Sequence, residues 1–140
     1  PIVPYGTIAV DFGMSQDIKV GDIALVGDFI VGKIVSVTAN HSIVSLFGGK
    51  NEEASFLVGD KRLPLEGQGA GFGAFNSDIA SGIGNDLINQ SARLAEYPDY
   101  FFGSVIGIDP SGKDQYDSLF IQSPVNIFEL QIIDIVSNEK

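Results

Sequence analysis

Short runs of β-branched, aliphatic and aromatic residues recur along the chain, and glycine, proline or asparagine bounds most of them. Runs of this length predict strands, because β-branched and aromatic side chains pack well on a pleated surface. The predicted strands are Thr7–Phe12, Ile30–Val37, Ile43–Phe47, Ala54–Val58, Gly103–Ile108 and Ser118–Gln122. Their close spacing predicts an all-β sandwich or barrel.

Turn signals separate these strands. The triplet Val-Gly-Asp occurs at residues 20–22, 26–28 and 58–60, and we expect each copy to lie at the end of a strand. Residues 109–112 read Asp-Pro-Ser-Gly. They predict a tight turn, because proline presets φ and glycine accepts a positive φ.

Two further segments differ in clarity. Between Phe128 and Asp134 apolar and polar residues alternate, and this period of two predicts a half-buried strand. The segment Asp86–Glu96 fits either a helix or a strand. We read Leu87–Gln90 as a strand and the rest as a loop or a short helix.

The chain also resembles itself. Val31–Val37 is similar to Phe102–Ile108, and Ser45–Phe47 recurs as Ser118–Phe120. We interpret these similarities as an internal duplication that yields two small six-stranded β-barrels. The first is predicted over residues 1–66 and the second over residues 67–140, with the C-terminal strand able to pack across the boundary.

Composition narrows the function. The net charge of -10 disfavours binding to nucleic acids, whose phosphates it would repel. The chain has no cysteine, which excludes disulfides and thiolate metal sites. No apolar run approaches the roughly 18 residues of a membrane-spanning helix.

His41 is the only histidine, so it would have to be the base of any serine hydrolase. Ser81 is a candidate nucleophile, but it lacks the Gly-x-Ser-x-Gly elbow. His41 lies in a polar loop, residues 38–42. We therefore interpret it as a surface histidine and predict no catalytic residue. A trypsin-like hydrolase is kept as the least favoured alternative.

Two segments have the composition of ligand-binding loops. Gly67–Gly73 is rich in glycine, but no lysine follows it as in a phosphate-binding loop, so we predict a strand or an interbarrel bend. Asp109, Asp114 and Asp117 could be a calcium loop, but the bidentate glutamate is missing, so we predict a solvated turn. We expect no cofactor and no metal.

Tyr97, Tyr100, Phe101 and Phe102 cluster around Pro98. They could fill the core at the start of a strand. They could also form an exposed patch for a protein partner, because aromatic residues dominate the energetics of interfaces. These four residues are the predicted interaction site. Exposed rings at Tyr97 or Tyr100 would also suit a third possibility, a β-barrel module that binds glycans or another ligand.

The order of several motifs resembles the rod shape-determining MreC family. Residues 17–22 (Asp-Ile-Lys-Val-Gly-Asp) are similar to a strand entry of that family, and residues 30–37 and 103–108 are similar to its Val-Gly-Lys and Ile-Gly-Lys strands. The most specific match is residues 119–130, which include Ser-Pro-Val-Asn and resemble the C-terminal ending of the family. Residues 85–99 depart from the pattern, and the middle of the chain is shortened near residues 67–75.

This resemblance implies a two-barrel domain of chymotrypsin-like architecture without catalysis. It implies a non-catalytic scaffold of the cell-elongation and peptidoglycan synthesis machinery, located in the periplasm or on the outer face of the cell membrane. The expected partners are a class B penicillin-binding transpeptidase and an MreD-like membrane protein. An N-terminal transmembrane helix and an upstream coiled coil, through which the protein would self-associate, are also implied.

Overall fold

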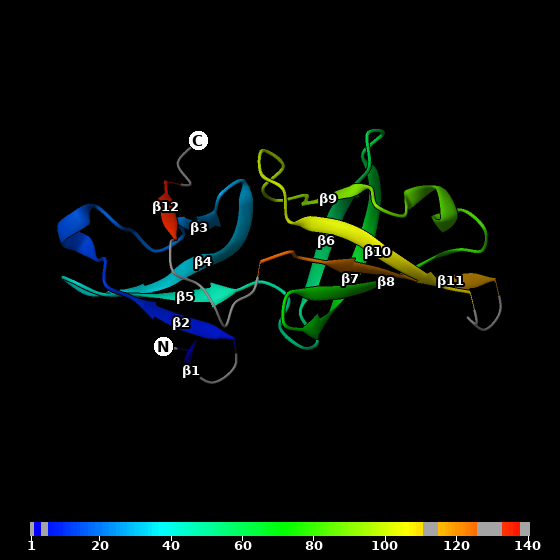
Figure 1. Ribbon diagram of the computed structural model, residues 1–140. Coiled ribbons are helices and arrows are strands. Elements are labelled where there is room, and N and C mark those ends of the chain that lie inside the picture. The colour runs from blue at the N-terminus through cyan, green and yellow to red at the C-terminus, as the bar shows by residue number, and fades with distance from the viewer. Residues whose placement is uncertain (1, 4–5, 111–114, 126–132, 138–140) are drawn as a thin grey trace. The chain divides into compact units, whose positions relative to one another are not determined.

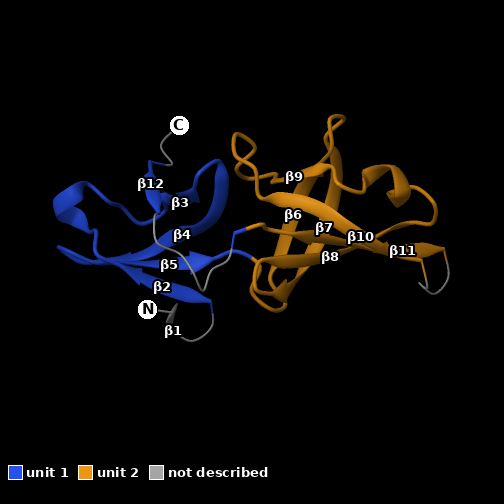
Figure 2. Ribbon diagram, in the orientation of Figure 1, with its two compact units in different colours: residues 1–47, 125–140 blue, residues 48–124 orange. Residues whose placement is uncertain are grey.

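The computed structural model describes residues 2–3, 6–110, 115–125 and 133–137 (Figure 1). The chain divides into two compact units, shown in Figure 2. Unit 1 contains residues 1–47 and 125–140, and unit 2 contains residues 48–124. Each unit is built on antiparallel strands, so the predicted all-β class is confirmed.

Unit 1 is a six-stranded antiparallel sheet in the order β1-β2-β5-β4-β3-β12. Its strands are β1 (Ile2–Val3), β2 (Thr7–Val10), β3 (Ile23–Val26), β4 (Phe29–Val37), β5 (Ser42–Leu46) and β12 (Asp134–Val136), with a 3-10 turn, η1 (Met14–Gln16), after β2. One face carries an aliphatic core: Ile8, Ile18, Ala24, Val31, Ile34, Val44 and Leu46. Burial of these side chains drives the unit to fold.

Unit 2 is a closed barrel in the order β10-β11-β8-β7-β6-β9. Its strands are β6 (Glu53–Val58), β7 (Leu63–Gly71), β8 (Ala74–Ala80), β9 (Ser91–Leu94), β10 (Gly103–Asp109) and β11 (Tyr116–Gln122), with a 3-10 helix, η2 (Gly84–Leu87), before β9. Three fully buried rings, Phe56, Phe75 and Phe102, meet edge to face inside the barrel, with centroids 4.8 to 5.6 Å apart. Such edge-to-face pairs add stability beyond the area they bury.

The two units share one order of strands. Reading across each sheet, β1-β2-β5-β4-β3-β12 corresponds to β7-β8-β11-β10-β9-β6. In each unit five of the strands are consecutive in the sequence, β1–β5 in unit 1 and β7–β11 in unit 2. The sixth comes from elsewhere: β12 lies at the C-terminal end of the chain, and β6 follows directly after β5. The order of strands is therefore the same in both units, completed by a strand from a different place in the sequence, while pairing of β6 with β7 closes unit 2 into a barrel.

Residue-level detail agrees with this correspondence. Gly32 of β4 is paired with Ala24, and Gly103 of β10 is paired with Ala92. A Cβ on Gly32 would overlap the carbonyl oxygen of Ser45, and a Cβ on Gly103 would overlap that of Gln122. Only glycine fits where a neighbouring backbone approaches so closely.

Both strands also carry a β-bulge at the same distance from that glycine. The register between β4 and β5 shifts between Ile34 and Ser36, and the register between β10 and β11 shifts between Val105 and Gly107. A bulge places one extra residue in one strand and increases the local twist. The two units thus bend the same strand at the same point.

The predicted boundary between residues 66 and 67 differs from the division into compact units. It falls inside β7, which pairs with β6 on one side and with β8 on the other. A boundary there would cut these ladders. The division between compact units lies at residues 47/48 and 124/125 instead. The C-terminal strand β12 does pair with β3 of unit 1, as a strand packing across the predicted boundary would.

The six strands predicted from apolar runs are confirmed as β2, β4, β5, β6, β10 and β11. The strand predicted over Leu87–Gln90 is wrong, because Leu87 ends η2 and the strand that follows is β9. Of the alternating C-terminal segment, residues 128–132 lie outside the described residues.

The sequence match of Ser45–Phe47 with Ser118–Phe120 also disagrees with the pairing of the strands in the structure. Val44 pairs with Ile34, and its counterpart in unit 2 is Ile121, which pairs with Val105. The observed correspondence is therefore displaced by four residues from the similarity in sequence.

Candidate interaction surfaces

The structure separates the four predicted interaction residues into two pairs. Tyr97 and Phe102 are buried, with 8% and 1% of their surface exposed, and Phe102 belongs to the aromatic core of unit 2. Their assignment to an exposed patch is therefore corrected. A ring this deeply buried contacts the core rather than a partner.

Tyr100 and Phe101 are half-buried, so only these two rings reach the surface. The guanidinium of Arg93 lies over the Phe101 ring, 4.3 Å from its centroid, and Arg93 Nη1 donates a hydrogen bond of 2.8 Å to the carbonyl of Pro98. A cation held over an aromatic face stabilises both side chains. The surface at Phe101 therefore carries one positive charge, Arg93, which is held by both the ring and the backbone.

The phenol of Tyr97 has a raised pKa. Burial is the main cause that raises its pKa to about 12, and the hydrogen bond and charge of Glu96 raise it further. Since both effects disfavour the phenolate, Tyr97 stays neutral throughout the physiological range.

His41 lies in the loop between β4 and β5, largely exposed, and its Nε2 is 3.6 Å from Asp11 Oδ1. Its backbone N–H and carbonyl face the Thr38 hydroxyl, at 3.2 and 3.3 Å. Within the described residues, no serine hydroxyl is hydrogen-bonded to the imidazole. Ser81 belongs to unit 2, at the end of β8, where its backbone N–H donates to the carbonyl of Gln115.

The glycine-rich segment lies in the hairpin of β7 and β8. Gly67 packs on Phe56, whose ring carbon would lie 2.9 Å from an added Cβ, and a Cβ on Gly69 would overlap the carbonyl oxygen of Gly49. A strand, not a helix, follows it, and this confirms a glycine-laden strand rather than a phosphate loop.

Two of the three aspartates near residue 112 lie among the described residues. Asp117 is buried and its Oδ2 accepts a hydrogen bond of 3.1 Å from Gly82 N–H, while Asp109 is exposed at the end of β10. Asp114 lies outside the described residues. No group of three metal-ligating side chains forms among the residues that the structure describes.

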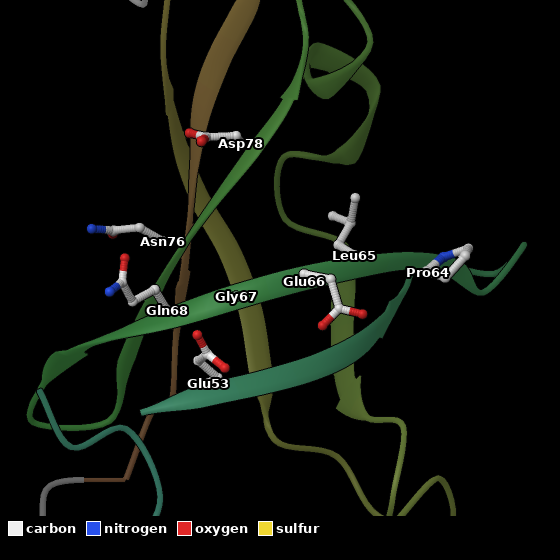
Figure 3. A pocket seen from close by; sticks show the side chains of 8 residues that line it. All are labelled: Glu53, Pro64, Leu65, Glu66, Gly67, Gln68, Asn76 and Asp78. Carbon is white, nitrogen blue, oxygen red and sulfur yellow. The ribbon is translucent and has the colours of Figure 1, made fainter. Parts of the chain in front are cut away.

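A polar hollow of about 660 Å³ opens on the outer face of unit 2 (Figure 3). It forms where β7 and β8 diverge, since their pairing begins only at Gln68 and Asn76. Its lining comprises Glu53, Pro64, Leu65, Glu66, Gly67, Gln68, Asn76 and Asp78. A side-chain hydrogen bond still joins β7 and β8 here, since Ser77 Oγ donates to the Glu66 carbonyl over 2.7 Å. No aromatic ring lines the hollow, so it lacks the feature on which the glycan-binding alternative depends.

Sequence reasoning missed the exposed aliphatic residues at the two bulges. In unit 1 these are Val20 and Val35, and in unit 2 they are Ile88 and Ile106. Strict alternation within a strand would have placed every second apolar residue in the core. The bulge breaks that alternation, and an aliphatic run followed by glycine, as at Ile106-Gly107, is the one sequence signal that could have indicated it.

Comparison with known proteins supplies the fold but no relative by sequence. No family model and no curated protein matches the chain. The structure of MreC from Pseudomonas aeruginosa superposes with a TM-score of 0.79 over 95% of this chain and 90% of that one, at 12% identity. The chain has an MreC-like fold.

Two further solved structures agree. Another MreC structure gives a TM-score of 0.79 over 96% of this chain and 81% of that chain, at 13% identity. The major periplasmic domain of the cell shape-determining filament MreC gives 0.66 over 95% and 87%, at 12% identity. The resemblance to MreC noted in the sequence is thus confirmed for the fold. Among the described residues, no helix of this MreC-like fold is long and apolar enough to span a membrane.

Proposed function

We propose that the chain is the extracytoplasmic region of a non-catalytic scaffold that maintains cell shape. The observation that carries the proposal is the MreC-like fold, which covers 95% of the chain at a TM-score of 0.79. One neighbour with this fold is named as a cell shape-determining filament and as a periplasmic domain. The proposed location is accordingly outside the cytoplasmic membrane, with an N-terminal transmembrane helix as the anchor in the full-length protein.

The proposed partners are those of the elongation and peptidoglycan synthesis machinery. They are a class B penicillin-binding transpeptidase, an MreD-like membrane protein and further copies of the protein through an upstream coiled coil. Within this chain, Tyr100 and Phe101 are the residues of the predicted patch that reach the surface, and we propose them as a contact for the transpeptidase. A half-buried aromatic pair suits this role, because aromatic side chains lose little conformational entropy on binding.

We further propose that the two units arose by duplication and that unit 1 is also a barrel. The shared order of six strands, the paired glycines Gly32 and Gly103, and the matched bulges support this origin. On this view, each repeat contributes five strands to one unit, and its sixth strand lies in the other unit. The predicted limit at residue 66 would then lie close to the end of the first repeat, after β6.

Binding to the transpeptidase tests the proposed contact. By biolayer interferometry, we expect this chain to bind the extracytoplasmic domain of its host's elongation transpeptidase saturably, with a dissociation constant on the order of micromolar. Replacing both Tyr100 and Phe101 by serine should weaken binding about tenfold or more, because hot-spot rings carry most of the energy of an interface.

The matched control is Tyr116→Ser, which removes an exposed aromatic ring from β11 of the same barrel. It should bind like the unmodified chain. Equal binding by all three proteins would contradict the proposed contact at Tyr100 and Phe101, and no binding by a folded chain would contradict the transpeptidase as a partner of this region.

A further inference from the structure

We propose that the aliphatic surface beside η2 in unit 2 is a docking site for a protein segment whose aliphatic residues are flanked by lysine or arginine. The surface consists of Ile83, Ile88 and Ile106, whose exposed fractions are 52%, 41% and 59%. Contiguous exposed aliphatic side chains on a soluble domain are typical of a binding site.

A hydrogen bond places two of these residues next to each other, and the third immediately precedes η2, which packs on β10. Asn89 N–H donates to the carbonyl of Val105 over 2.8 Å. Ile88 precedes Asn89 and Ile106 follows Val105, so these two isoleucines lie side by side on antiparallel segments. Ile83 immediately precedes Gly84, the first residue of η2. A Cβ on Gly84 would lie 2.6 Å from Ile108 Cδ1, which places η2 directly against β10.

The bulge in β10 explains why one of these side chains points outward. Ile106 is the extra residue of the bulge in β10, so it faces solvent while Val105 stays in the core. The same happens in unit 1, where Gly21 N–H donates to the Ile34 carbonyl and the neighbours Val20 and Val35 are exposed. An exposed aliphatic pair at the same point of both units indicates that the bulge serves to present it.

Charge identifies the kind of partner. The segments that carry the surface, residues 79–92 and 103–110, contain Asp86 and Asp109 and no lysine, arginine or histidine. Both aspartates are exposed. An apolar centre with an acidic rim is complementary to an aliphatic segment with a basic rim, which favours encounter and excludes acidic competitors. The corresponding segments of unit 1 also contain Lys19 and Lys33. The exposed pair Val20 and Val35 therefore lacks a uniformly acidic rim.

This inference goes beyond the proposed scaffold role, since it names a second surface and does not use Tyr100 or Phe101. Its test therefore needs no transpeptidase. The probe is a short fluorescent peptide that alternates leucine with lysine, titrated with the whole chain by fluorescence anisotropy. The reference peptides alternate leucine with glutamate and serine with lysine.

We expect saturable binding of the leucine–lysine peptide and at least about tenfold weaker binding of both reference peptides. The variant Ile88→Thr, Ile106→Thr should lose about tenfold in affinity, because it removes the apolar centre and keeps β-branched side chains in place. The matched variant Val20→Thr, Val35→Thr changes the equivalent positions of unit 1 and should bind within about twofold of the unmodified chain. Asp86→Asn, Asp109→Asn, which leaves every aliphatic contact intact, should weaken binding and reduce its dependence on salt.

Three results would overturn the proposal: no binding of the leucine–lysine peptide, equal binding of the serine–lysine peptide, or equal losses in the two aliphatic variants. The last would indicate non-specific adhesion to an acidic protein. A failure of transpeptidase binding would leave these titrations unchanged, so the two proposals can be contradicted separately.

Discussion

Replacing Phe102 by alanine is expected to lower the free energy of unfolding by about 3–5 kcal/mol, the usual cost of removing a buried ring and leaving a cavity. Phe102 is 1% exposed and contacts Phe56 and Phe75 edge to face at 5.6 and 5.5 Å. The barrel is closed around these rings, so its strands cannot collapse easily into the space left behind. Urea denaturation followed by far-ultraviolet circular dichroism measures this loss.

The adjacent residue provides the control. Phe101 is half-buried, and the guanidinium of Arg93 lies over its ring. Phe101→Ala should therefore cost only about 1 kcal/mol. Similar losses at the two positions would contradict the separation of the aromatic cluster into a core ring and a surface ring.

Gly103→Ala is expected to destabilise the chain by about 3 kcal/mol, at the upper end of the cost of overpacking. The added Cβ would overlap the Gln122 carbonyl oxygen and lie 2.7 Å from its carbonyl carbon. Since both atoms belong to the backbone of β11, the clash can be relieved only by separating β10 from β11. The midpoint of thermal unfolding, measured together with the urea midpoint, reports the change.

Gly107→Ala is the matched control on the same strand. A Cβ there meets no heavy atom within 4 Å, and the backbone is outside the left-handed region. Its effect should stay within about 0.5 kcal/mol, as for other uncrowded substitutions. If Gly103→Ala were equally mild, close approach of the strands would not be the reason for glycine at position 103.

The sequence predicts well the strands whose own composition favours extended structure. The β-branched runs of β4, β5 and β10 were found because local propensity and tertiary structure agree there. Strand β7 was predicted only as a strand or a bend over Gly67–Gly73, because Gly67 and Gly69 weaken the local signal, and β8 was missed. The two glycines of β7 are required by long-range contacts, with Phe56 and with Gly49, which no local pattern records.

The strand β9 shows the opposite conflict. Residues 86–96 have a composition that also suits a helix, yet Ser91–Leu94 pairs with β6 and with Gly103 and Ser104 of β10. Pairing on both sides outweighs helix propensity, which is worth only tenths of a kcal/mol per residue. A prediction from local pattern alone therefore placed the strand a few residues too early.

The candidate site was predicted only in part for a related reason. An aromatic cluster indicates burial or binding but not which. Phe101 and Phe102 immediately precede β10, and which of the two rings is buried depends on how this segment joins the barrel. The exposed residues Ile88 and Ile106 depend on a bulge, a property of the ladder between two strands. Such a property is fixed by register, and the weak internal similarity misplaced the register of β11 by four residues.

The most direct test of the scaffold role is cell shape. In a rod-shaped host, the full-length protein that carries this chain would be depleted and the ratio of cell length to width followed by microscopy. We predict that cells lose their cylindrical shape and become round, and that expression of the unmodified protein restores rods. Cells that keep an unchanged ratio after complete depletion would contradict the proposed function.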